Sequence, residues 1–270
     1  MIKAFVFVSA GMILTTSASA QQDAQRWDYS LKLGRSESKG KYGGDLETRT
    51  ETTDLTASAF YGGWALDLNL PYTRLIQQTV VGRRGVILGL GGRPIGGARL
   101  GRGAQVIETS AEGLGDATTS VTHTFYGANK ESWNVDLGGT VKFSTGDTAK
   151  GLSTGEKDYT LYTGAFRSFG NLSANLAAGR TWLGNPPGTV YRNPWYWSAD
   201  AGYDLTPHWR IGSGYSYEQS ATGDSANPRA VSLSLRYKLN DTWRLQGKVS
   251  KGISDGSPDL SGGLSLTANF

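Results

Sequence analysis

Few side chains in this sequence could perform catalytic or metal chemistry. Its 270 residues contain two histidines, His123 and His208, and no cysteine. The lack of cysteine excludes disulfides, iron–sulfur clusters and thiolate zinc sites, and two histidines leave little basis for a histidine-rich metal centre. We therefore expect neither a metal nor a cofactor, and we identify no catalytic residue.

The two histidines also bear on whether the chain is an enzyme. A serine hydrolase needs a histidine within hydrogen-bond reach of the nucleophile and a third group that orients it. His208 follows Pro207 at a predicted turn, and His123 lies late in a predicted strand. Both are expected at strand ends on the side of the fold where the connections are short, whereas an outer-membrane lipase would need its histidine on the opposite side. An enzyme is the less favoured alternative.

One glycine-rich segment concentrates positive charge. From Val80 to Glu108 the chain has nine glycines and no acid before Glu108, and its arginines are Arg83, Arg84, Arg93, Arg99 and Arg102. Three interpretations stay open. In the first, the segment folds into a pore and places Arg93 and Arg99 at a constriction. In the second, its arginines stay outside and pair with lipopolysaccharide phosphates. In the third, it is a solvated, mobile loop. The segment also contains Gly-x-Gly sequences. They do not indicate a dinucleotide site, because such a site needs a preceding strand, a following helix and a downstream acidic residue.

The first twenty residues have the features of a signal peptide. Lys3 precedes an apolar stretch from Ala4 to Leu14, and Ala18-Ser19-Ala20 matches a small-residue cleavage site. The apolar stretch is too short to span a bilayer. We therefore expect residues 1–20 to be removed, leaving an exported mature chain over 21–270 that meets no nucleic acid.

The mature chain shows the period-2 alternation of β-strands and no strong helical periodicity. Gly263–Phe270 is the clearest example, with apolar residues alternating with serine, threonine and asparagine. The same pattern predicts twelve strands, at residues 26–36, 49–61, 64–77, 113–127, 132–145, 156–168, 172–184, 193–205, 208–219, 229–239, 242–252 and 260–270.

The connections between these segments alternate between tight turns and longer loops. The longest connection covers about 78–112, and the tight turns include Gly62-Gly63, Gly170-Asn171, Thr206-Pro207 and Asn240-Asp241. Tryptophans and tyrosines fall near strand ends, as in the aromatic girdles of outer-membrane proteins. These features predict one domain: a transmembrane antiparallel β-barrel with short periplasmic turns and longer extracellular loops.

The polar face of the predicted strands would line the barrel interior. Charges are costly in a dry core and are tolerated in a water-filled or plugged lumen. The cationic side chains that we expect to line a substrate pathway are Lys142, Arg210, Arg236, Arg244 and Lys248. They would orient polar or anionic groups. The main alternative is a structural or adhesion barrel, plugged by pairs of these arginines with Asp136 or Asp200.

Three short motifs occur around the middle of the chain. Gly113–Asp116 has the sequence GLGD, Ser144–Asp147 has STGD, and Thr154-Gly155 precedes Asp158-Tyr159. They resemble motifs of the outer-membrane transporter family named for the MetA pathway of phenol degradation, which usually has PTGD at the second motif. The resemblance is strongest over 113–184.

The resemblance implies a barrel in the outer membrane of a Gram-negative bacterium that transports a small aromatic or hydrophobic molecule. We expect passive uptake through a narrow channel surrounded by outer-membrane lipids and lipopolysaccharide. A small aromatic acid would reconcile an aromatic substrate with a cationic lumen. The terminal Phe270 is similar to the sorting signal of such barrels, which implies recognition by the barrel-assembly machinery.

If the arginine-rich segment narrows the pore, deleting residues 82–103 should raise the single-channel conductance of the refolded protein. The reason is that its side chains would no longer occupy the lumen. Planar-bilayer recording at a fixed salt concentration measures this, and an unchanged conductance would contradict the constriction hypothesis.

Overall fold

The computed structural model describes residues 26–42, 44–82, 85–88, 105–129, 132–223 and 225–270. The predicted signal peptide lies outside these residues, and so do Arg93 and Arg99 of the predicted constriction. Within the described ranges, no helix is long and apolar enough to cross a membrane.

The described chain forms fourteen β-strands. Their bounds are β1 Asp28–Gly40, β2 Thr48–Tyr61, β3 Trp64–Gly82, β4 Gly85–Leu88, β5 Gln105–Leu114, β6 Thr118–Phe125, β7 Asn134–Lys142, β8 Asp158–Phe169, β9 Leu172–Trp182, β10 Trp195–Asp204, β11 Trp209–Glu218, β12 Arg229–Lys238, β13 Trp243–Gly252 and β14 Leu260–Asn269. Alternation of leucine or aromatic residues with serine, threonine and charged residues suits a pleated sheet with one apolar and one polar face.

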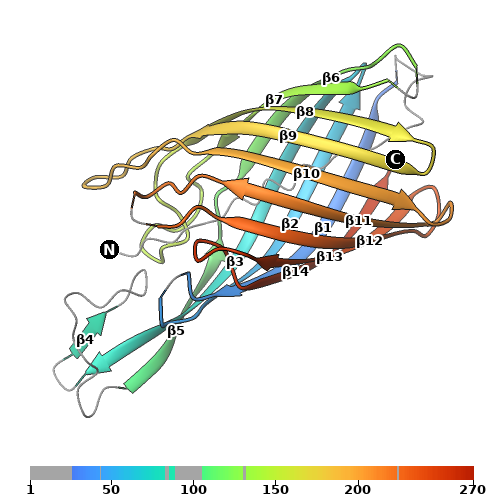
Figure 1. The fold of residues 1–270 in the computed structure, drawn as a ribbon. Helices are drawn as coiled ribbons and strands as arrows, with labels where there is room; N and C mark the ends of the chain where they lie inside the picture. Colours follow the sequence, from blue (N-terminus) through green and yellow to red (C-terminus); the bar gives the residue numbers. More distant parts are fainter. Residues whose placement is uncertain (1–25, 43, 83–84, 89–104, 130–131, 224) are drawn as a thin grey trace.

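Twelve of these strands close into an antiparallel barrel. The neighbours follow the order β2-β1-β14-β13-β12-β11-β10-β9-β8-β7-β6-β3, and β3 pairs with β2 to complete the circle. Figure 1 shows the tilted strands wrapped around a common axis. Closure pairs both edges of each of the twelve strands, so the predicted twelve-stranded barrel is confirmed.

The turns at the periplasmic end are as tight as predicted. β2 ends at Tyr61 and β3 begins at Trp64, and the intervening Gly62 and Gly63 have φ values of 54° and 87°. Glycine adopts such angles without steric strain, and two-residue turns of this kind match the twist of the paired strands.

The long connection expected over 78–112 is shorter than predicted, because strands extend into it from both sides. β3 continues to Gly82, β5 begins at Gln105, and the two strands pair with each other beyond the barrel. The short β4 pairs with the end of β3. In Figure 1 the extension formed by the end of β3 with β4 and β5 projects past the loops at one rim. The sequence pattern did not predict these strands, because the segment is rich in glycine and glycine is uncommon in strands.

The strand predicted over 113–127 is interrupted where it passes Pro71. The pairing of β3 with β5 and its pairing with β6 differ in register by one residue. Proline has no N–H to donate to the ladder. Its carbonyl accepts a hydrogen bond from the Gly115 N–H at 2.9 Å, which anchors the residues of the break.

The two faces of the wall differ in polarity as expected. On β12, Leu233 and Leu235 are 64% and 44% exposed on the outer face, whereas Ser232 and Ser234, which alternate with them, face inward. Aromatic pairs lie at both ends of the strands. Trp209 and Tyr237 have ring centroids 4.3 Å apart at the periplasmic end, and Trp197 and Tyr215 are 5.1 Å apart at the other.

Two inward tyrosines lie against glycines of the neighbouring strand. A Cβ atom added to Gly138 would come within 2.4 Å of Cζ of Tyr162, and one added to Gly179 would come within 2.5 Å of Cζ of Tyr196. The missing side chains therefore let both tyrosines lie along the wall. Tyr162 also shares a hydrogen bond with the Thr122 hydroxyl.

We expect Gly138→Ala to lower the free energy of unfolding by about 1–3 kcal/mol, because the new methyl group displaces the hydrogen-bonded Tyr162 ring. The matched control is Gly139→Ala, whose Cβ would meet Leu161 at an ordinary 3.4 Å. Urea unfolding of the refolded barrel measures both. If Gly138→Ala lowered the free energy of unfolding equally in a protein that also carries Tyr162→Ser, this packing explanation would be refuted.

Candidate functional site in the barrel lumen

Three adjacent strands present arginines to the barrel interior near its periplasmic end. Arg210 on β11 lies directly opposite Arg236 on β12. Arg236 pairs with Gln246 of β13, and Arg244 precedes Gln246 by two residues on the same face. Arg244 is therefore the diagonal neighbour of Arg236. Lys248 follows on the inner face of β13, so the structure gathers four of the five predicted pathway residues on one part of the wall.

These cations differ in their partners. Arg210 donates to both carboxylate oxygens of Asp204, at 3.1 and 3.3 Å, and to the Ser173 hydroxyl. Lys248 lies within electrostatic range of Asp200. Among the described residues, no ion pair or hydrogen bond joins Arg236 or Arg244 to another side chain, and Nε of Arg236 is buried without a partner. The wall therefore holds two unpaired guanidinium groups.

Two of the inward acids accept hydrogen bonds from hydroxyl groups, whereas Asp54 lies 3.8 Å from the Lys32 ammonium group. Ser58 donates to Asp67 at 2.5 Å, and Thr124 donates to Asp136 at 2.7 Å. The plugged-barrel alternative predicted that Asp136 or Asp200 would pair with the arginines. In the part of the chain that the structure describes, no such ion pair closes the lumen.

Lys142, the fifth predicted pathway residue, belongs to a different environment. Its ammonium group lies 3.0 Å from the Asp116 carboxylate and 2.8 Å from that of Asp158, and its side chain is only 10% exposed. Each carboxylate also accepts a backbone N–H, from Gly146 at 3.0 Å and Gly184 at 2.9 Å. We call Lys142, Asp116 and Asp158 the rim cluster.

The rim cluster explains why the sequence motifs occur together. Asp116 ends the GLGD motif, Gly146 belongs to STGD, and Asp158 belongs to the second half of the third motif. The cluster joins the break after β5 to the loops that follow β7 and β9. Burial raises the pKa of Tyr191 in the latter loop, and the nearby Asp158 carboxylate raises it further. The Asp147 carboxylate of the second motif instead accepts a hydrogen bond from the Ala149 N–H of the adjacent turn at 2.9 Å.

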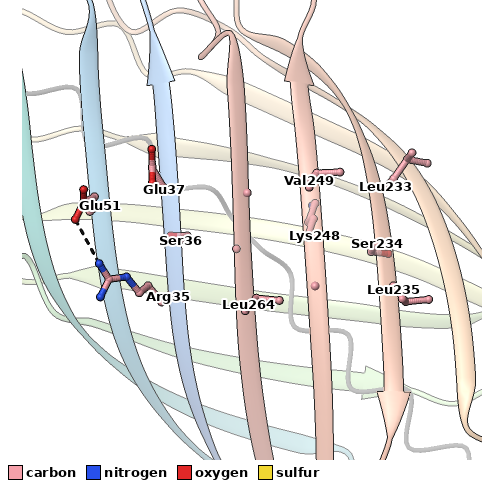
Figure 2. A pocket seen from close by; sticks show the side chains of 13 residues that line it. Arg35, Ser36, Glu37, Glu51, Leu233, Ser234, Leu235, Lys248, Val249 and Leu264 are labelled. Carbon is pink, nitrogen blue, oxygen red and sulfur yellow. Dashed lines mark hydrogen bonds and ion pairs between the residues drawn. The ribbon is translucent and has the colours of Figure 1, made fainter.

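A separate groove of about 600 Å³ lies on the wall formed by β12, β13, β14, β1 and β2. Glycines 247, 262 and 263 make this wall thin, and leucines of β12 and β14 line it. Figure 2 shows Arg35 reaching toward Glu51, to which it is joined at 3.5 Å. Most of the residues that line it face outward, and the inward-facing Lys248 and Ser234 also contribute, so the groove straddles the wall at this point.

Both histidines lie beside aromatic side chains. His123 lies on the outer face, with its ring 4.5 Å from Trp64 and 4.6 Å from Phe125 between centroids. His208 lies beside Tyr237 at 6.4 Å. No serine hydroxyl is hydrogen bonded to either imidazole among the described residues.

Comparisons with known proteins agree with this architecture. A family model described as "Putative MetA-pathway of phenol degradation" matches residues 48–270. The COG4313 outer membrane channel from Pseudomonas putida F1 is similar with a TM-score of 0.65 and 13% identity, over 92% of this chain and 98% of that one.

Two further solved structures share the fold. The KdgM porin has a TM-score of 0.54 and 10% identity, over 89% of this chain and 99% of that chain. The CymD monoaromatic hydrocarbon channel has a TM-score of 0.50 and 10% identity, over 91% and 89%. No curated protein sequence gives a significant match.

Replacing Lys142 with methionine should destabilise the barrel by about 3–5 kcal/mol, because two buried carboxylates would lose their shared cation. Lys150→Met is the matched control. Lys150 is 54% exposed and lies 4.0 Å from its acidic partner, so its loss should change stability by less than about 0.5 kcal/mol. Urea unfolding measures both variants, and equal effects would contradict a structural role for the rim cluster.

Proposed function

This chain belongs to the family described as the MetA-pathway of phenol degradation, and from this premise we propose that it is a passive outer-membrane channel for small aromatic or hydrophobic molecules. Its fold is that of the outer-membrane barrels of Gram-negative bacteria, which places the protein in that membrane. The observation that carries the proposal is a closed barrel with an apolar outer face and a polar inner face.

Several features favour a channel over the alternatives. The three similar structures described above are channels or a porin, and one of them is a channel for monoaromatic hydrocarbons. A plugged barrel would need ion pairs across the lumen, whereas Asp67 and Asp136 accept hydrogen bonds from hydroxyl groups of neighbouring strands. A serine hydrolase would need an oriented histidine, and His123 is packed among outer-face aromatics.

The contacts of the outer face belong to the same proposal. We infer that lipopolysaccharide phosphates pair with outward cations at the extracellular end, such as Lys39, which is exposed near the end of β1. Phe270 is 66% exposed at the opposite end, which leaves its ring accessible to the barrel-assembly machinery.

Cysteine labelling tests whether current flows through the lumen. The chain has no cysteine of its own, so single substitutions give unambiguous labelling. We expect a charged methanethiosulfonate reagent to reduce the planar-bilayer current of Ser232→Cys, because this side chain faces inward. Its neighbour Leu233→Cys faces the lipid and should keep its full current.

Two results would contradict the channel proposal. One is the absence of conductance from a protein shown to be folded by its heat-modifiable migration in gels. The other is equal block of the two cysteine variants, which would place the current outside the lumen.

A further inference from the structure

We propose that Arg236 and Arg244 form a carboxylate-binding site for small aromatic acids on the route through the lumen. The proposal rests on the proposed channel function and adds to it a substrate class and the residues that recognise it. A planar guanidinium group donates two parallel hydrogen bonds to a carboxylate, which makes arginine well suited to such a ligand.

The first observation is the crowding of like charges. Side chains directly opposite each other in an antiparallel pair have Cβ atoms about 4.5–5.5 Å apart, and like charges at this position are destabilising. Arg210 and Arg236 occupy such a pair. Arg244 and Arg210 both lie within electrostatic range of Arg236. The strand register therefore maintains a repulsion that a bound anion would relieve.

The second observation is that no acid among the described residues forms an ion pair with Arg236 or Arg244. Asp204 is the acid within range of Arg236, but its two oxygens already accept from Arg210. Nε of Arg236 is buried and has no hydrogen-bond partner. Buried donors are normally satisfied, so an unpaired guanidinium facing a passage indicates a place for an external acceptor.

The third observation concerns the aromatic part of the ligand. Tyr196 is the second residue of β10 and lies toward the extracellular end, whereas Arg236 lies two residues from the periplasmic end of β12. Tyr162 and Tyr196 lie along the wall against glycines and within electrostatic range of each other. Their rings offer aromatic surface before the arginines are reached.

A permeating aromatic acid would meet separate contacts for its ring and for its carboxylate. The ring first contacts the tyrosines in the outer half of the lumen, and the carboxylate then binds the arginines near the exit. An uncharged aromatic molecule would use only the first of these contacts. The channel should therefore retain benzoate more strongly than benzamide, its uncharged analogue of similar shape.

The experiment measures benzoate and benzamide binding to the refolded full chain in detergent micelles by titration calorimetry. We expect the variant Arg236→Gln/Arg244→Gln to bind benzoate at least about tenfold more weakly, since hydrogen bonds to charged groups contribute at this level. The matched control is Arg229→Gln/Lys251→Gln, which removes two positive charges from the outer faces of the same strands, β12 and β13. This control should bind benzoate as the wild type does.

A charge-preserving variant guards against loss of folding. Arg236→Lys/Arg244→Lys keeps both charges and loses the planar donors, so it should bind benzoate with intermediate affinity. Benzamide binding as tight as benzoate binding, or equal benzoate affinity in the wild type and the double glutamine variant, would overturn the proposed site.

Conductance of the same preparations separates the site from the channel. A conducting wild-type barrel that does not bind benzoate would overturn the arginine site and leave the channel proposal intact. Arginine-dependent benzoate binding by a folded barrel without conductance would support the site and overturn the channel.

Discussion

The whole structure depends on satisfying every backbone N–H and C=O group within a lipid bilayer. Hydrocarbon offers no hydrogen-bond partner, so a sheet can span it only when its edges are joined. Here β1 joins β14 and β2 joins β3, which completes the wall. Once the wall is closed, the pleat sends alternate side chains to lipid and to lumen, and the polarity of each strand residue follows from its side.

The one interruption in this ladder explains the most distinctive local chemistry. Pro71 cannot donate to β5 or β6, and the chain opposite it breaks its register. The break brings Asp116 to Lys142, and Lys142 also meets Asp158 from the following strand. Removing these charges from water is costly, and their mutual hydrogen bonds offset the cost. The loops at the extracellular rim are thereby attached to the barrel.

Some charged side chains in the lumen have hydrogen-bond partners, whereas others do not. Inward acids such as Asp67 and Asp136 accept hydrogen bonds from hydroxyl groups of neighbouring strands. Arg236 and Arg244 have no such partner in the described part of the chain. A channel can keep unpaired cations because water and permeating solutes reach them, whereas a plugged interior would have to neutralise them.

The sequence alone determined the barrel, its twelve strands and its tight turns, because period-2 alternation and turn residues are local signals. It also placed Arg210, Arg236, Arg244 and Lys248 on the inner face, since strand parity decides which side a residue occupies. Only the tertiary structure decided which of these cations stay unpaired and which, like Lys142, are held by distant carboxylates. The physical reason is that ion pairing depends on strand register, which joins residues far apart in the chain.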